Sequence, residues 1–351
     1  MAVIEVLSPG LLTTVQDLGR HGYGHLGVSP SGAADPVALR LGNRLVGNPE
    51  SAAALEMTLA GGRFRFPDGA VVALAGADFE GAPLWTTLEV GPEQTLSVGA
   101  ARSGARCYLC VRGGIAAPLF LGSASTQLAC ALGGFHGRRL RRGDLLETAA
   151  AQGPVARRAL SPRALEYLAP SNTLRVTRGP EWESFDASSG EAFLSTPYRV
   201  AADSDRAGLR LEGASLVSCF ANASTMLACG AGLQPAAPQA KPPAPRGSAF
   251  PRGLRSRTLA MRAPGGMITE GVDLGTIQAP PSGQPIILFV EQQTTGGYPR
   301  IGVVASVDLF RVGQLRPGDE VRFRLVSLEE AVRLIREQEQ LLASEEFLFA
   351  D

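Results

Sequence analysis

Lysine is almost absent from this chain, since Lys241 is the only lysine among 33 basic side chains. A Walker A phosphate-binding loop, a Schiff-base lysine on a strand and a biotinyl-lysine carrier each need a lysine in a defined setting. Lys241 lies in a stretch rich in proline and alanine, outside an Ala-Met-Lys-Met context. The sequence therefore excludes these three chemistries in this chain.

The chain also lacks an excess of charge of one sign and any long apolar run. Its formal net charge is zero and no basic stripe is present, so neither nucleic acid nor a membrane surface is an expected partner. No segment reaches about 18 consecutive apolar residues, the length needed to cross a membrane. The start of the chain has neither the basic nor the apolar region of a signal peptide. We therefore expect a cytoplasmic protein.

Metal-binding side chains are few and poorly spaced. The five cysteines show no regular spacing, which suits reduced thiols. Cys107 and Cys110 form a C-x-x-C pattern, but they lie in a strand-like run where this spacing puts them on opposite faces. His21 and His25 are separated by glycines rather than by a helical turn. No metal site is predicted.

Internal repeats divide the chain of 351 residues into two halves. Because a typical domain has roughly 150 residues, this length suggests two domains. Several short patterns of the first half return in the second, which favours two copies of one domain. We expect domains at 1–160 and 161–351. The repeated segments are residues 4–6 and 174–176, 35–41 and 205–211, 104–111 and 283–290, and 140–144 and 315–319.

The local pattern is mainly β with few helices. Short β-rich runs at 70–74, 95–98, 106–112, 285–290 and 321–325 are separated by Gly, Pro, Asp and Ser, as in a sandwich or barrel. A helix is expected after Asp35-Pro36, ending near residues 47–48, and a second at about 327–345 with a capping-box start. Residues 162–172 are expected to join the halves, and residues 221–253 to form a flexible surface insertion.

A candidate binding loop follows the apolar run at residues 286–290. It reads QQTTGGYP at 292–299, so a buried strand leads into amides, hydroxyls, a phenol and two glycines. Adjacent glycines let the backbone approach a ligand closely, although a hairpin turn between core strands gives a similar pattern. Thr294, Thr295 and Tyr298 have no counterpart in the first half, and this asymmetry favours a binding role.

Ordered motifs along the chain resemble the family of the 5-oxoprolinase C subunit, also called the KipA or allophanate hydrolase subunit 2 family and labelled biotin-dependent carboxyltransferase-like. The resemblance covers about residues 3–325. It rests on LLTTVQDLGR at 11–20, GVSPSGAAD at 27–35, NRLVGN at 43–48, Leu55-Glu56, SDRAGLRLEG at 204–213, GTIQAP at 275–280 and QTTGGYPR at 293–300. Glu291-Gln292 departs from the Asp-Arg that is common in the family at this place.

The resemblance implies two tandem cyclophilin-like β-barrel domains and a heteromeric complex. The C subunit helps to cleave 5-oxo-L-proline to L-glutamate together with the B subunit, which is KipI-like, and the A subunit, which is LamB/YcsF-like. ATP would be bound by the complex and need not be bound by this chain alone. Two other functions stay open: a KipA-like regulator of a KipI-type sensor-kinase inhibitor, and the carboxyltransferase component of a urea carboxylase or allophanate hydrolase-type system.

A lactam site needs donors for an anionic group and for a developing oxyanion. Asp35, Arg206 and Tyr298 are the catalytic candidates, with Glu56 as another base. Asp35 is equally suited to cap a helix, and its counterpart in the repeat is Asp205. Arg40 and Arg210 also repeat, which suits an ion pair as well as a ligand contact. The expected substrate-binding residues are Gln16, Arg20, Ser31, Arg210, Gln278, Gln293, Thr294, Thr295, Gly296 and Gly297.

Overall fold

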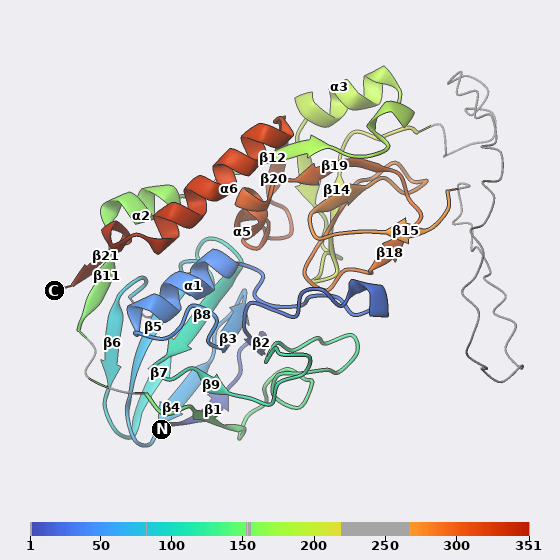
Figure 1. Cartoon of the computed structure of the whole chain (residues 1–351). Helices are drawn as coiled ribbons and strands as arrows, with labels where there is room; N and C mark the ends of the chain where they lie inside the picture. The colour runs from blue at the N-terminus through green and yellow to red at the C-terminus, as the bar shows by residue number, and fades with distance from the viewer. Residues whose placement is uncertain (1, 82, 152, 154–155, 219–266, 351) are drawn as a thin grey trace, which may run out of the picture.

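The chain folds into two β-rich halves that lie side by side (Figure 1). The computed structural model describes residues 2–81, 83–151, 153, 156–218 and 267–350. The first half holds two five-stranded sheets, and the second holds a closed barrel of seven strands. The prediction of a mainly β protein is confirmed. The insertion expected at 221–253 lies outside the described residues, and so does Lys241.

The sheets of the first half face each other across one apolar core. All their strand pairs are antiparallel, and Ile4, Val6, Phe64 and Leu109 are fully buried between them. One sheet has the order β7 (Gln94–Ser97), β4 (Arg63–Phe66), β1 (Val3–Ser8), β10 (Leu145–Thr148), β9 (Ile115–Ala116). The other has the order β2 (Leu12–Gln16), β3 (Ala54–Thr58), β8 (Arg106–Val111), β5 (Ala70–Gly76), β6 (Thr87–Val90).

Helix α1 (Pro36–Leu45) covers the outer face of β5 and β8. Asp35 caps the helix by accepting a hydrogen bond from the Ala38 N–H at 2.8 Å, and Pro36 occupies the first turn, as predicted. Strand β8 is buried on both faces because it lies between this helix and the sandwich core. Cys107 therefore faces the core and Cys110 faces α1, which confirms that the two thiols point to opposite sides.

The second half is a barrel closed by a parallel pair of strands. Leu174, Val176, Ile301 and Phe323 fill its interior, and a small hairpin pairs β15 (Glu270–Gly271) with β18 (Thr295–Gly296) at its rim. Around the barrel the strands are β12 (Thr173–Arg178), β19 (Arg300–Val304), β16 (Thr276–Gln278), β17 (Ile286–Leu288), β14 (Gly208–Glu212), β13 (Tyr198–Val200) and β20 (Glu320–Leu325).

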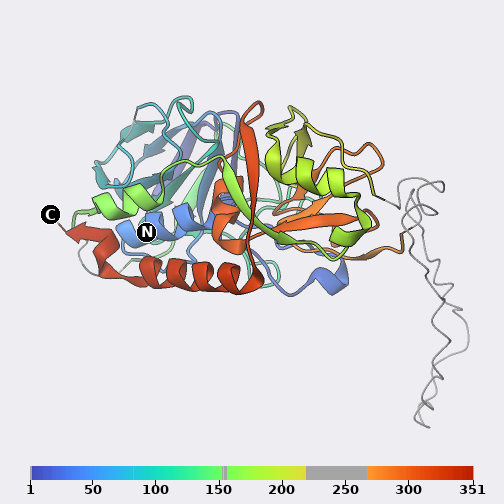
Figure 2. The same cartoon turned by 90° about the horizontal axis from the view of Figure 1, so that it is seen from above.

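The end of the chain returns to the first half. Helix α6 (Leu328–Ala343) begins at Ser327, which accepts a hydrogen bond from the Glu330 N–H at 3.1 Å. Figure 2 shows α6 beside α1, where Leu342 shares an apolar cluster with Leu39. The last strand, β21 (Leu348–Ala350), pairs with β11 (Arg158–Leu160). The remaining helical elements are η1 (Gly24–Leu26), α2 (Pro162–Tyr167), η2 (Trp182–Ser184), α3 (Ala187–Ser195), η3 (Ser306–Asp308), α5 (Leu309–Val312) and η4 (Glu345–Phe347). The boundary at 160/161 stays a prediction.

Only some of the repeated segments are structurally equivalent. The turns at 140–144 and 315–319 have the same hydrogen bonds, with Asp144 and Asp319 each accepting from the N–H three residues earlier. The expected match of Asp35 with Asp205 is wrong, because Asp35 caps a helix whereas Asp205 precedes a strand and accepts from the Gly208 N–H at 3.1 Å. Strand β1 also pairs antiparallel with β10, while β12 pairs parallel with β20.

Candidate functional site

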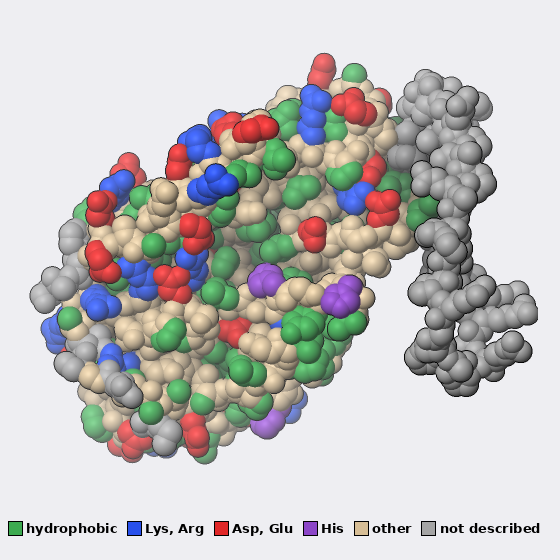
Figure 3. All heavy atoms as spheres, viewed as in Figure 1, with side chains coloured by type: hydrophobic (Ala, Val, Ile, Leu, Met, Phe, Trp, Pro, Cys, Tyr) green, Lys and Arg blue, Asp and Glu red, His purple; other side chains and the backbone are tan. Residues whose placement is uncertain are grey.

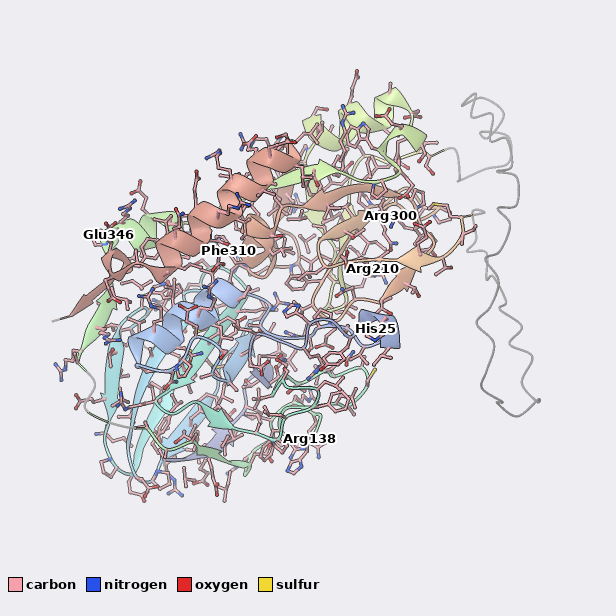
Figure 4. All side chains as sticks on the ribbon, viewed as in Figure 1. His25, Arg138, Arg210, Arg300, Phe310 and Glu346 are labelled. Atoms are coloured by element: carbon pink, nitrogen blue, oxygen red, sulfur yellow. The ribbon has the colours of Figure 1, made fainter. Side chains whose placement is uncertain are left out.

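Three loops meet at the junction between the halves. The Ser31 N–H donates to the Val290 carbonyl at 2.8 Å, and the Leu128 N–H donates to Glu291 Oε2 at 3.2 Å. The loop at 17–33, which carries η1 and His25, leaves the first half and lies against the second (Figure 4). The loops at 17–33, 120–137 and 290–299 therefore form one contiguous region. It contains most of the residues that the sequence singles out.

Asp17 anchors two of these loops. Its carboxylate accepts hydrogen bonds from Ser123 Oγ at 2.6 Å, the Ala124 N–H at 2.6 Å and the Gly19 N–H at 2.8 Å. A carboxylate that accepts several such bonds holds its loop rigidly. Arg20 follows directly in the anchored segment, so its position is set by the same contacts.

Arg20 is almost fully buried, with 2 % of its surface exposed. Its guanidinium donates to the Ser125 carbonyl and lies 5.5 Å from the centre of the Phe120 ring. Burial lowers the pKa of Arg20, and the nearby carboxylates of Asp17 and Glu291 oppose that shift. Arg20 Nη1 has no hydrogen-bond partner among the described residues. One donor of a buried cation is therefore free for an anionic group.

Buried amides and a hydroxyl lie beside this arginine. Gln16 Nε2 donates to Thr126 O at 3.0 Å, and Ser31 Oγ donates to the same carbonyl at 2.8 Å. Gln127 Nε2 donates to Ser29 Oγ at 2.7 Å. The Oε1 atoms of Gln16 and Gln127 accept no hydrogen bond in the described part of the chain. Both amides thus use their donors internally and leave an acceptor unused.

The second half contributes the complementary donors. Gln293 Nε2 donates to Gln278 Oε1 at 3.3 Å, which leaves Gln278 Nε2 without a partner in the described residues. Gly296 lies against these two amides, since a Cβ atom there would be only 2.4 Å from Gln278 Nε2. A side chain at this position would therefore displace the Gln278 amide. Thr294, Gly297 and Tyr298 are half-buried, and Thr295 is exposed.

Unpartnered polar atoms concentrate at this junction. Buried polar side-chain atoms in proteins nearly always have a hydrogen-bond partner, so each exception needs an explanation. Among the described residues six such atoms lack one, and five of them are at the junction. They are Gln16 Oε1, Arg20 Nη1, Gln127 Oε1, Gln278 Nε2 and Gln292 Oε1. Their donors and acceptors match a small molecule with an anionic group and an amide.

A buried ion network lies beneath the loops. Arg206 donates to Glu56 of β3, to Glu291 at 2.5 Å and to the Gly32 carbonyl at 2.6 Å. The side chains of Arg206, Glu56 and Glu291 are 7 %, 1 % and 5 % exposed. Glu56 also accepts from the Tyr108 hydroxyl at 2.7 Å. All three nitrogen atoms of the Arg206 guanidinium donate hydrogen bonds within the protein. Arg206 therefore positions the loops and joins the halves.

Asp35 lies on the other side of this network. Its N–H donates to the Tyr108 hydroxyl at 2.8 Å, and its Oδ2 accepts from Gln314 Nε2 at 2.7 Å. Burial raises the pKa of Asp35 to about 6, against the hydrogen bonds from Ala38 and Gln314. Asp35 lines a cavity of about 730 Å³ between the halves, together with Trp85, Phe310 and the segment 168–172. Asp35 is therefore separate from the glutamine amides at the junction.

Arg210 is also separate from the loop cluster. It points outward from β14, where its exposed side chain pairs with Asp203 at 3.1 Å (Figure 4). Arg40 likewise forms ion pairs, with Glu50 at 2.6 Å and Glu339 at 2.7 Å.

Sequence reasoning missed Tyr108, Gln127 and Gln314. Tyr108 lies inside strand β8, whereas Gln127 lies in the loop at 120–137 and Gln314 in the turn after α5, where no motif marks them. That reasoning used Glu291 only as a departure from a family pattern. Buried polar residues inside apolar strands are the one signal that could have found Tyr108.

The described residues contain no group of three His, Cys, Asp or Glu side chains that could hold a metal ion. Within the same ranges, no helix has both the length and the apolar character needed to cross a membrane.

Comparisons with known proteins agree with these features. Residues 26–325 match the family model for the carboxyltransferase domain, subdomain A and B. The C subunit of the 5-oxoprolinase of Escherichia coli is 33 % identical over 96 % of both chains. The urea amidolyase of Saccharomyces cerevisiae is 32 % identical over 97 % of this chain and 18 % of its own length. The crystal structure of the Kluyveromyces lactis urea amidolyase matches 99 % of this chain and 21 % of that one, with a TM-score of 0.78 and 28 % identity.

Proposed function

This chain belongs to the carboxyltransferase domain family with subdomains A and B, and on that basis we propose that it acts as the C subunit of an ATP-dependent 5-oxoprolinase. Two relatives that carry this subunit name, from Escherichia coli and Haemophilus influenzae, match along 96 % of their lengths. The complex would open 5-oxo-L-proline to L-glutamate. The single observation that carries the proposal is the set of unpartnered amide and guanidinium atoms at the junction.

The unpartnered atoms complement the groups of 5-oxoproline. The ligand has a carboxylate, a lactam carbonyl that accepts hydrogen bonds and a ring N–H that donates one. Arg20 Nη1 suits the carboxylate, Gln278 Nε2 suits the carbonyl oxygen, and Gln16 Oε1 or Gln127 Oε1 suits the ring N–H. A site that pairs buried polar groups with ligand groups discriminates strongly against analogues that lack them.

Ring opening requires water to add to the lactam carbonyl carbon and the ring nitrogen to leave with a proton. An unstrained lactam resists this step, and transfer of a phosphoryl group from ATP would make its carbonyl more electrophilic. Gln278 Nε2 would donate to the lactam carbonyl oxygen and hold it for transfer of the phosphoryl group, which would leave as phosphate after water has added to the carbon. Tyr298, which is half-buried on the same loop, is the proposed proton donor to the ring nitrogen.

The partner subunits would bind and use ATP in this scheme. The sequence contains no Gly-rich loop followed by a lysine, because Lys241 is preceded by Ala240. We assign phosphoryl transfer to partners of the LamB/YcsF-like and KipI-like types, with no metal held by this chain. The three described cysteines are free, which suits the reducing cytoplasm where we place the complex.

Purified chain mixed with the LamB/YcsF-like and KipI-like subunits, 5-oxoproline and ATP tests the proposal by release of glutamate. We expect turnover only when all three proteins are present. Absence of glutamate from a complex that assembles stably would overturn the proposed activity. Omission of each protein in turn provides the control.

Carboxyl transfer to urea or a related amide is the second candidate. It is supported by the likeness to the urea amidolyase structure over almost the whole of this chain. This reaction would need biotin carried by another chain. Avidin added to the assembled complex separates the two candidates, because it blocks a biotin-dependent reaction and leaves a biotin-independent ring opening unaffected.

A further inference from the structure

A basic pocket lies in the first half, beside the turn that leads into β10. Its volume is about 460 Å³. Arg139, Arg141 and Arg142 form one wall, and the turn at 9–11 with Thr13 forms the other. Arg138, at the start of the same segment, is labelled in Figure 4 below the loop at 120–137. The three wall arginines are exposed, whereas Thr13 is fully buried.

The turn itself does not need Arg142. In both halves a glycine with positive φ, Gly143 at 86° and Gly318 at 90°, reverses the chain. Each glycine N–H donates to a neighbouring strand, Gly143 to Val6 O at 2.8 Å and Gly318 to Val200 O at 2.7 Å. The second-half turn has Pro317 where the first has Arg142. Because the same turn forms without it, Arg142 has no structural role in the reversal.

The only acidic group in this turn is already engaged. Asp144 accepts two hydrogen bonds from the Arg138 guanidinium, at 2.7 and 2.8 Å, and one from the Arg141 N–H. No carboxylate of the described residues lines the pocket. Within the described ranges, the guanidinium groups of Arg139, Arg141 and Arg142 form no ion pair, although most exposed arginines of α6 and β20 do. Three arginines thus line one concavity, and the neighbouring carboxylate of Asp144 offsets only part of their positive charge.

We propose that this pocket binds a phosphate-bearing anion with at least two negative charges. A guanidinium group can donate two parallel hydrogen bonds to phosphate oxygens. Three guanidinium groups in one pocket favour a multivalent anion over a monovalent one. The concave wall formed by the turn at 9–11 limits the ligand to a small molecule. The exposed side chain of Leu11, at 59 % of its surface, adds an apolar edge that suits a phosphoester. The site is independent of the lactam site and of the proposed function.

Isothermal titration of the full-length chain with inorganic pyrophosphate in low-salt buffer tests the assignment. We expect one site whose affinity falls as salt is added. Arg139→Gln and Arg142→Gln should each weaken binding about tenfold, because each removes a charge-assisted hydrogen bond. Arg336→Gln, an exposed arginine on α6, is the matched control and should bind as the unaltered chain does.

No binding of pyrophosphate, or equal binding by the Arg139 and Arg142 variants, would overturn the proposal. Tighter binding of citrate than of pyrophosphate would overturn the assignment to phosphate. If a variant fails to fold, a protection experiment on the unaltered chain still tests the site. Pyrophosphate should protect Arg139, Arg141 and Arg142 from phenylglyoxal, detected by mass spectrometry, and equal modification with and without it would contradict the site.

Discussion

Replacing Arg206 with methionine removes the cation that joins the two halves. The guanidinium bridges Glu56 of the first half and Glu291 of the second, and both carboxylates are buried. Methionine keeps much of the apolar stem, so the change leaves two buried negative charges without their partner. A charge-assisted hydrogen bond contributes about 1.5–3 kcal/mol. The two bonds to the carboxylates are lost, together with the bond to the Gly32 carbonyl. We therefore expect the free energy of unfolding to fall by about 3–5 kcal/mol, as for other broken buried pairs.

Urea unfolding followed by circular dichroism measures this change, with the first transition taken as the one that separates the halves. Arg210→Met is the matched control, because Arg210 lies in the same half and pairs with Asp203 at the surface. The Arg210→Met variant should lose no more than about 1 kcal/mol in free energy of unfolding. If the Arg206 variant lost less than about 1 kcal/mol, or no more than the control, the buried network would not hold the halves together.

Two further substitutions test the cavity residue and the loop. Asp35→Asn keeps a helix cap but removes a carboxyl whose pKa burial raises from 3.8 to about 6. The native state of the unaltered chain holds this proton to a higher pH than the unfolded state does, so the free energy of unfolding falls as pH rises from about 4 to 6. The asparagine variant lacks this dependence. The difference in free energy of unfolding between the two proteins should therefore change by on the order of 3 kcal/mol between pH 4 and 7. A pH-independent difference in urea unfolding would refute the shift. Gly296→Ala should reduce turnover at least tenfold because its Cβ would meet Gln278 Nε2 at 2.4 Å, whereas Gly271→Ala on the paired strand has open space and should keep full activity. Equal activity of the two alanine variants in the glutamate assay would contradict the packing.

Local patterns predicted much of the fold. Short β-rich runs bounded by turn residues located strands such as β5, β8 and β20 within one or two residues. The caps at Asp35 and Ser327 located two helices. Helix α3 was not predicted, since its sequence ASSGEAFLS has little helical periodicity and only Ser189 and Phe193 are buried. Its position depends on packing against the barrel, including stacking of Phe193 on Phe323 at 4.5 Å.

The junction shows what sequence could not predict. Gln16, Arg20 and Ser31 were recognised from motifs. Their contacts reach residues far apart in the chain, since all three bond to the loop at 120–137 and the Ser31 N–H also donates to Val290 O. The partner of Arg206 could not be predicted, because Glu56 lies 150 positions away in another half. The segments that begin at Asp35 and Asp205 are similar in sequence but differ in structure, because a helix begins at Pro36 and a strand begins at Gly208.

Helix α6 carries side chains of both charges. Positive and negative side chains are interspersed on the face shown in Figure 3. On α6, Arg333 pairs with Glu337 at 2.6 Å. Such pairs contribute little to stability and leave no field of one sign. Arg139, Arg141 and Arg142 differ from these pairs because they line one pocket together and form no ion pair among the described residues, which is why a specific anion is expected there.

Gln278→Met in the assembled complex tests the lactam site most directly. Gln278 Nε2 has no partner in the described protein, and its Oε1 accepts only one long hydrogen bond, at 3.3 Å from the exposed Gln293. The isosteric apolar side chain should therefore leave thermal stability nearly unchanged. Gln338→Met is the matched control, because Gln338 Nε2 donates to the Tyr167 hydroxyl at 2.7 Å and to Val307 O at 3.2 Å, so its loss should destabilise the chain and spare turnover of the folded fraction. We expect the Gln278 variant to lose about 10–100-fold in kcat/KM for 5-oxoproline. Full turnover by that variant would contradict the assignment of the substrate to this junction.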